Sequence, residues 1–176
     1  MNITIFGGSQ PKPGSPAYEE AYELGKFLAL DGHTVVTGGY MGTMEAASRG
    51  ANEAGGHVIG VTCADIEAWR GTRANAWVKE ERRFATLQER LNELIGICEA
   101  AIALPGGPGT LAEVALTWNL MIIDSIPRKP LILIGDGWKN VMENFLREFA
   151  IYTYQDQKNI ISFARTIYEA RELVSR

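Results

Sequence analysis

Residues 100–113 read AAIALPGGPGTLAE, and this stretch decides the fold. Its first five residues form an uninterrupted apolar run, which is typical of a strand buried on both faces of a parallel sheet. The prolines and glycines that follow end the strand, and Thr110 is expected to cap a helix that begins near Leu111. Strand, glycine turn and helix in this order indicate a βαβ unit.

The rest of the chain repeats this pattern. Between short apolar runs lie stretches of helical period, the clearest at residues 17–30, with others at 83–97 and 163–174. Residues 62–77 have no sustained period and are expected to form a loop over one sheet edge that supplies a pocket wall. The other apolar runs are residues 3–6, 34–37, 57–61 and 130–134. We therefore predict an α/β protein, a single Rossmann-like, doubly wound parallel sheet flanked by helices, with residues 1–176 forming one domain.

Composition and charge exclude several classes of function. The chain has 176 residues and a net charge of −4, so it lacks the basic surface that would hold a nucleic-acid polymer or an anionic membrane. No apolar run approaches the ~20 residues that span a bilayer. The two cysteines match no metal-ligand spacing, so neither a metal nor a cofactor is expected. Because the first residues also lack the basic region of an export signal, we expect a cytoplasmic protein.

Glycine clusters follow three of the apolar runs, at residues 7–9, 38–44 and 105–110. In an open parallel sheet, ligands bind outside the carboxyl ends of the strands, and helix N-termini at that edge favour phosphate. Each cluster alone would also serve as a simple strand-to-helix turn, but three at equivalent positions favour one anionic pocket. The candidate phosphate- and nucleotide-binding residues are Gly8, Ser9, Gly39, Gly42, Thr43, Met44, Gly106, Gly107, Gly109 and Thr110.

Two common phosphate motifs are not satisfied. The chain has no G-x-x-x-x-G-K-[ST] sequence, which argues against a nucleoside-triphosphate hydrolase. Residues 107–112 do fit G-x-G-x-x-[GA], but the acidic residue expected about 20 positions later is missing, and Asp136 comes too late. Nicotinamide-dependent redox chemistry is therefore disfavoured.

Two charged side chains are candidates for chemistry. Glu113 would complete a capping box with Thr110, but a carboxylate on that helical turn would also face the pocket, where it could stabilise positive charge on a sugar or position a water. Arg90 lies near the core boundary of its expected helix and could reach inward. Arg82 and Arg83 are expected to be solvated.

Four motifs, at residues 5–9, 38–46, 55–61 and 104–113, stand in the order seen in the LONELY GUY family, once labelled possible lysine decarboxylases. The resemblance implies a Rossmann-like fold, a homodimer or higher homo-oligomer, and hydrolysis of cytokinin or related nucleoside 5′-monophosphates to free base and ribose 5-phosphate. It also implies that Glu113 and Arg90 are catalytic and that residues 106–110 bind the phosphate. Nothing in the chain looks like the Schiff-base lysine site of a decarboxylase.

The chain departs from the usual family pattern at Leu91, which follows Arg90 in place of a lysine, and at Ala112, where an acidic residue is common. These departures make it similar also to a sister branch of Rossmann-like proteins that includes molybdenum-cofactor carriers. The alternative function is therefore a non-catalytic nucleotide or molybdenum-cofactor binding or carrier protein. Either function implies a small-molecule ligand as partner.

Overall fold

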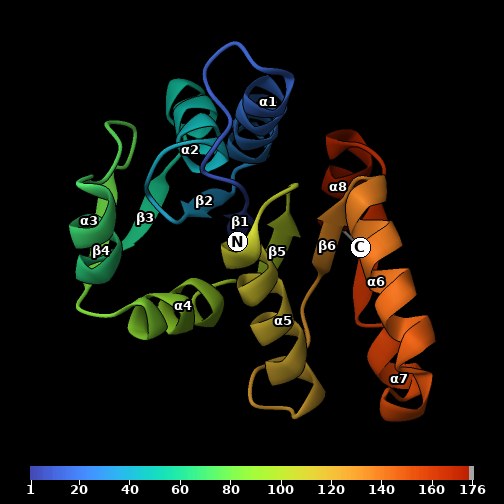
Figure 1. The fold of residues 1–176 in the computed structure, drawn as a ribbon. Helices are drawn as coiled ribbons and strands as arrows, with labels where there is room; N and C mark the ends of the chain where they lie inside the picture. The colour runs from blue at the N-terminus through green and yellow to red at the C-terminus, as the bar shows by residue number, and fades with distance from the viewer. Residues whose placement is uncertain (175–176) are drawn as a thin grey trace.

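The protein is built around a seven-stranded sheet in which every strand pair is parallel (Figure 1). The computed structural model describes residues 1–174, so positions 175 and 176 of the expected domain lie outside the described residues. The spatial order is β4-β3-β2-β1-β5-β6-β7, and strand order reverses between β1 and β5. The strands are β1 (Asn2–Phe6), β2 (Thr34–Thr37), β3 (Val58–Cys63), β4 (Glu80–Phe84), β5 (Ala100–Ala103), β6 (Leu131–Ile134) and β7 (Ile161–Ala164).

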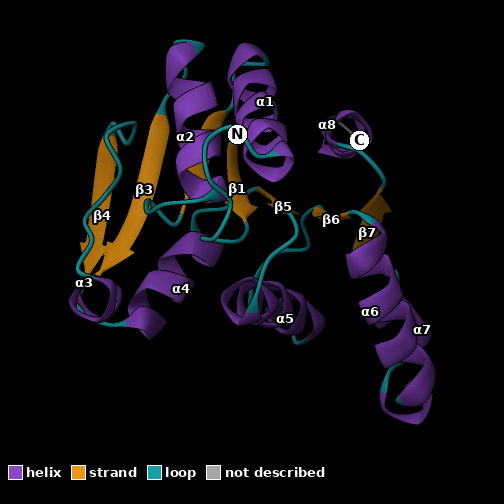
Figure 2. Ribbon diagram, turned by 45° about the horizontal axis from the view of Figure 1, so that its top comes forward, coloured by secondary structure: helices purple, strands orange, loops and turns teal. Residues whose placement is uncertain are grey.

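Helices cover both faces of the sheet, as Figure 2 shows. One face carries α1 (Pro16–Leu30), α2 (Thr43–Glu53) and α8 (Ile167–Val174). The other carries α4 (Leu87–Gly96), α5 (Pro108–Ile122) and α6 (Asp136–Glu148). The shorter elements are α3 (Ala64–Arg70), the 3-10 turn η1 (Ala150–Tyr152) and α7 (Gln155–Lys158). The predicted fold class, a doubly wound Rossmann-like α/β sheet, is confirmed.

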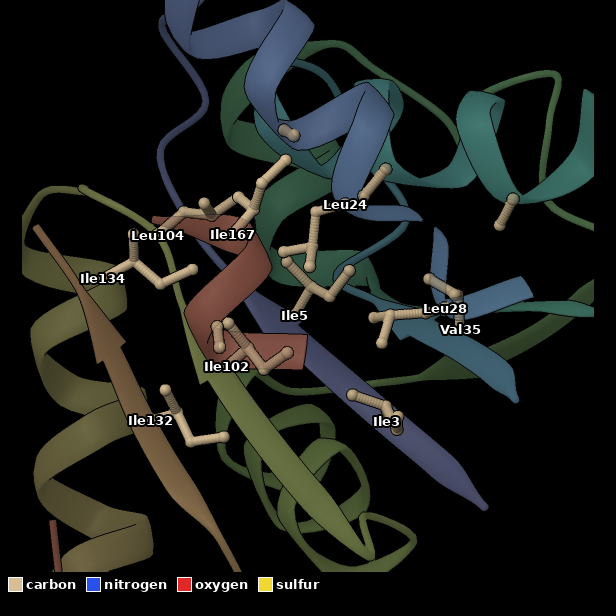
Figure 3. Close-up of a cluster of buried hydrophobic side chains, with 14 of the residues drawn as sticks. Ile3, Ile5, Leu24, Leu28, Val35, Ile102, Leu104, Ile132, Ile134 and Ile167 are labelled. Carbon is tan, nitrogen blue, oxygen red and sulfur yellow. The ribbon is translucent and has the colours of Figure 1, made fainter. Parts of the chain in front are cut away.

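Each face of the sheet has its own hydrophobic core. Figure 3 shows the core beneath α1, α2 and α8, where Leu24 and Leu28 of α1 meet Ile5 and Ile102 of the sheet. Neighbouring strand residues point to the opposite face, where Val61 and Leu133 pack with Met121 of α5. Because side chains alternate between two buried faces, the inner strands are rich in apolar residues.

The sequence prediction missed the two edge strands. β4 reads EERRF, and its charges form ion pairs at the surface, Arg82 with Glu80 and Glu93, and Arg83 with Glu67. The helix expected over residues 83–97 therefore begins only at Leu87. β7 likewise occupies the start of the helix expected over residues 163–174. An edge strand has a neighbour on one side only and can carry charged residues, so β4 contains no apolar run. β7 reads ISFA, and its last two residues fall within the helix expected there.

The expected loop at residues 62–77 is only partly a loop. Residues 62 and 63 end β3, and α3 follows at once. The helix ends at Gly71, which has φ +62° in the left-handed region that glycine adopts readily. Only the residues after Gly71 and before β4 are irregular.

Across residues 1–174, no helix combines the length and the apolar character that crossing a membrane requires.

Candidate functional site

A cleft of about 270 Å³ lies at the carboxyl edge of the sheet, where the loops after β1, β2 and β5 meet. Its volume is near the lower limit of about 300 Å³ for small-molecule sites. Most of the candidate residues line it: Gly8, Ser9, Met44, Arg90, Gly107, Gly109, Thr110 and Glu113. The cleft is therefore where the three glycine clusters were expected to converge.

The remaining candidates, Gly39, Gly42, Thr43 and Gly106, do not line the cleft but pack its loops together. The Thr43 backbone N–H donates to the Gly8 carbonyl at 2.9 Å, and the Thr43 hydroxyl donates to the same oxygen at 3.1 Å. Gly42 has φ +76°, and a Cβ there would lie 2.6 Å from the Cα of Ser9. Gly42 and Thr43 therefore bring the loops after β1 and β2 into direct contact, whereas Gly39 lies against Thr62 of β3 and Gly106 against Thr110 of α5.

Helix α5 begins earlier than the sequence predicted. Gly107 is its N-cap and Pro108 is its first residue, because the fixed φ of proline suits the first helical position. The expectation that Thr110 caps this helix is thus wrong, and so is the capping box with Glu113: no side chain caps the helix, and Thr110 is buried in its first turn. The first-turn N–H groups, which have no partner within the helix, belong to residues that line the cleft.

Arg90 is 4% exposed and is held at the ends of two strands. Its Nε donates to the carbonyl of Val61 at 2.8 Å, and its Nη2 donates to the carbonyl of Gly38 at 3.3 Å. A Cβ on Gly38 would lie 2.0 Å from Nη2, so only glycine leaves room for the guanidinium here. The guanidinium carbon also lies 5.6 Å from the ring centroid of Tyr40.

Glu113 is 8% exposed and faces Arg90 across the cleft floor. Its Oε1 lies 3.6 Å from Nη1 of Arg90, which is an ion pair but not a close hydrogen bond. Burial raises the pKa of the Glu113 carboxyl from 4.5 to about 7, although the positive charge of Arg90 acts in the opposite direction. Both the carboxylate and the carboxylic acid are therefore accessible near neutral pH, as general acid–base chemistry requires.

Several cleft residues were missed by sequence reasoning, Tyr40 among them. Its hydroxyl accepts from the Cys63 backbone N–H at 2.7 Å and donates to the Cys63 carbonyl at 3.0 Å. The Asn75 side-chain amide donates to the carbonyls of Gly39 and Tyr40, which fixes the loop after β2. The position of Tyr40 inside a glycine cluster was the available signal.

Gly7, Gln10 and Pro108, which are next to candidate residues in the sequence, were also missed. Two further lining residues, Ile66 and Arg70, come from α3. They lie in the stretch expected to supply a pocket wall, and Gly71 was the signal that a helix ends there. Arg82 and Arg83, expected to be solvated, are partly exposed in their ion pairs and do not line the cleft.

A doubly wound parallel sheet with a glycine-lined cleft where strand order reverses defines a Rossmann-like α/β protein. Residues 1–171 match the model of the SLOG cluster4 family, and the chain belongs to that family.

The chain is similar to proteins of two kinds, named as a phosphoribohydrolase and as molybdenum cofactor binding or carrier proteins. The rice (Oryza sativa subsp. japonica) protein named cytokinin riboside 5′-monophosphate phosphoribohydrolase LOG is 34% identical over 179 residues, which cover 98% of this chain and 70% of that protein. The resemblance to the LONELY GUY family is thus confirmed. The structure of the molybdenum cofactor binding protein from Rippkaea orientalis superposes with a TM-score of 0.77 at 28% identity, covering 99% of this chain and 94% of that one. The molybdenum cofactor carrier protein from Chlamydomonas reinhardtii, at 24% identity and a TM-score of 0.73 over 99% of this chain and 98% of that one, shares the fold.

Proposed function

We propose that the protein is a nucleoside 5′-monophosphate phosphoribohydrolase, which uses water to cleave the N-glycosidic bond and releases a free base and ribose 5-phosphate. The observation that carries this proposal is the buried carboxyl group of Glu113, which lies in the cleft 3.6 Å from Arg90 with a pKa raised to about 7. The similarity to the rice phosphoribohydrolase supports the same reaction.

The N-terminus of α5 is the proposed phosphate site. Gly109 and Thr110 line the cleft in the first turn of this 15-residue helix, whose N-terminal end carries a partial positive charge and unpaired N–H groups. Gly106 and Gly107 form the turn that leads into it, and Ser9 lines the same cleft from the loop after β1. Because Glu113 lies about one turn further along α5, a phosphate held there places the ribose next to the carboxyl group.

The reaction breaks the bond between C1′ and the base nitrogen, and both electrons leave with the base. The ribose then has oxocarbenium character, which the Glu113 carboxylate stabilises by its negative charge. The oxygen of a water molecule bonds to C1′, Glu113 accepts the proton that this water loses, and the proton ends on the departing base. Arg90, fixed by two backbone carbonyls, orients the carboxylate and favours its ionised form.

The second candidate is a non-catalytic binder or carrier of a nucleotide or of molybdenum cofactor. The similarity to the Rippkaea orientalis molybdenum cofactor binding protein supports it. Such a protein would use the same anion-binding turn, since both kinds of ligand present a phosphate, but it would have no need of a titrating carboxyl group beside the sugar.

Chromatography of reaction mixtures separates the two candidates. The purified protein is incubated with a panel of nucleoside 5′-monophosphates, and free base and ribose 5-phosphate are the expected products. E113Q should lose at least about a hundredfold in turnover while its nucleotide affinity stays within a few-fold, because it removes charge from the transition state and not from the phosphate site. E143Q, at an exposed position of α6, is the matched control. Retention of intact nucleotide without product would contradict the hydrolase and favour the carrier.

We also propose that the chain forms a homodimer. Val141 and Phe145 of α6 and Phe149, which directly follows this helix, are exposed apolar residues spaced by four, so they lie on one face. Exposed apolar side chains that cluster on one face are typical of protein interfaces. Light scattering should give twice the 19.3 kDa chain mass, and F145D should reduce it to that of one chain.

A further inference from the structure

Helix α3 forms the wall of the cleft at the end away from α5. Ile66 and Arg70 are four residues apart, so they lie on one face of α3, and both line the cleft. In Figure 2, α4 lies between α3 and α5 on the same side of the sheet. Arg90 spans this distance, since it bonds to the carbonyl of Val61 in β3, the strand before α3, and faces Glu113 of α5. The cleft therefore runs from α5, past this pair, to α3.

The position of α3 is fixed by contacts with β4 and α4. Arg83 of β4 donates two hydrogen bonds from Nε and Nη2 to Oε2 of Glu67, at 3.0 and 2.8 Å. The Leu87 backbone N–H, at the start of α4, donates to Oδ2 of Asp65 at 2.8 Å. Because α3 is held from both sides, the side chain of Arg70 begins from a defined place at the cleft wall.

The guanidinium of Arg70 lies against an aromatic ring, and no ion pair in the described residues uses its N–H donors. Its central carbon lies 4.8 Å from the ring centroid of Trp69. No carboxylate in the described part of the chain forms an ion pair with it. An arginine side chain has five N–H donors in a planar fork and no acceptor, and Arg70 lines this end of the cleft together with the apolar side chain of Ile66.

In the proposed binding mode, the phosphate lies at the N-terminus of α5 and the ribose at Glu113, and the base extends along the cleft toward Ile66 and Arg70 of α3. A 6-oxopurine presents two neighbouring acceptors, O6 and N7, which match two parallel N–H groups of a guanidinium. A 6-aminopurine presents an N–H₂ donor at position 6, and this donor repels one of the two guanidinium N–H groups. We infer that Arg70 makes the cleft selective for nucleotides of 6-oxopurines, such as GMP and IMP, over AMP. The inference rests on the proposed binding mode of a nucleoside 5′-monophosphate.

The test is equilibrium binding of GMP, IMP and AMP, measured by calorimetry in the E113Q background so that no ligand is consumed. The E113Q variant without other substitutions should bind GMP and IMP about tenfold more tightly than AMP. This ratio is at the lower end of the discrimination that a bidentate arginine contact provides. Adding R70M should bring the three affinities within about twofold by weakening GMP and IMP only. R70K, which keeps the charge but not the fork of donors, should lose the same preference.

R73M is the matched control, because Arg73 is an exposed arginine three positions further on that does not line the cleft. It should leave all three affinities unchanged. The inference is overturned if AMP binds as tightly as GMP, if none of the three binds, or if R70M and R70K weaken AMP and GMP equally, which would identify a phosphate contact.

If the proposed hydrolysis is wrong, the experiments give a different result from the one expected if the role of Arg70 is wrong. The protein with Glu113 in place would then release no free base from any of the three nucleotides, whatever their order of binding. A preference for GMP and IMP without product would support base recognition by Arg70 and contradict hydrolysis. Product with equal use of AMP and GMP would support hydrolysis and contradict the role of Arg70.

Discussion

Replacing Glu113 with glutamine should change how the stability of the protein depends on pH. Burial raises the pKa of this carboxyl from 4.5 to about 7, so the folded protein holds the proton more tightly than the unfolded chain does. Between these two values the folded state is protonated where the unfolded state is not. The free energy of unfolding must therefore fall as the pH rises from about 4.5 to about 7, and it stays lower above that range.

The size of this change in unfolding free energy follows from the rise in the pKa of Glu113. At about 1.4 kcal/mol per pKa unit, a rise from 4.5 to about 7 corresponds to about 3 kcal/mol of stability lost across the window. Glutamine cannot ionise, so E113Q removes this loss and leaves the other titrating groups in place. The difference in unfolding free energy between E113Q and the wild type should thus change by about 2–3 kcal/mol in favour of the variant between pH 5 and pH 8.

Urea denaturation followed by circular dichroism at half-unit steps of pH measures this difference directly. E143Q removes one carboxylate from an exposed position, and its stability should follow that of the wild type across the range. Parallel curves for E113Q and the wild type would refute the reasoning, because they would mean that burial does not hold the proton on Glu113.

Three further predictions concern the same cleft. If the Glu113 carboxylate is the reactive form, kcat/KM for hydrolysis should rise with pH through an apparent pKa of about 7, and a profile that falls through this range in steady-state assays would contradict that role. Y40F removes a buried hydroxyl that makes two hydrogen bonds to the backbone and should lower the unfolding free energy by about 1–3 kcal/mol in urea titrations, whereas an unchanged midpoint would disprove the contact. G38A places a Cβ 2.0 Å from Nη2 of Arg90 and should reduce turnover at least about tenfold by displacing the guanidinium. G96A, where nothing lies within 4 Å of the added carbon, is its control and should keep full activity.

The sequence predicted the inner strands of the sheet well. Residues 3–6, 34–37, 57–61, 100–104 and 130–134 correspond closely to β1, β2, β3, β5 and β6. Each of these strands has a neighbour on both sides and helices over both faces, so most of its residues are apolar. The edge strand β4 is free of that requirement, which is why no apolar run marked it. β7 reads ISFA, and the sequence pattern assigns its last two residues to the helix that follows.

The spacing of residues in the sequence led to a wrong prediction at the start of α5. Thr110 and Glu113 have the spacing of a capping box, but Pro108 starts the helix earlier and leaves both side chains inside it. There Glu113 is buried and paired with Arg90, a residue of another helix. A capping box depends on residues three apart, whereas this ion pair depends on where two helices lie relative to each other.

The amino-acid sequence by itself determined the doubly wound sheet and the edge at which its glycine clusters meet, because apolar runs and glycine turns act through the backbone of their own segments. The tertiary structure alone decided that Arg90 meets Glu113 and that α3 brings Arg70 to the cleft. The free energy of a charged group depends on the water it loses and on the charges that approach it. Segments distant along the chain determine both, so no local pattern records them.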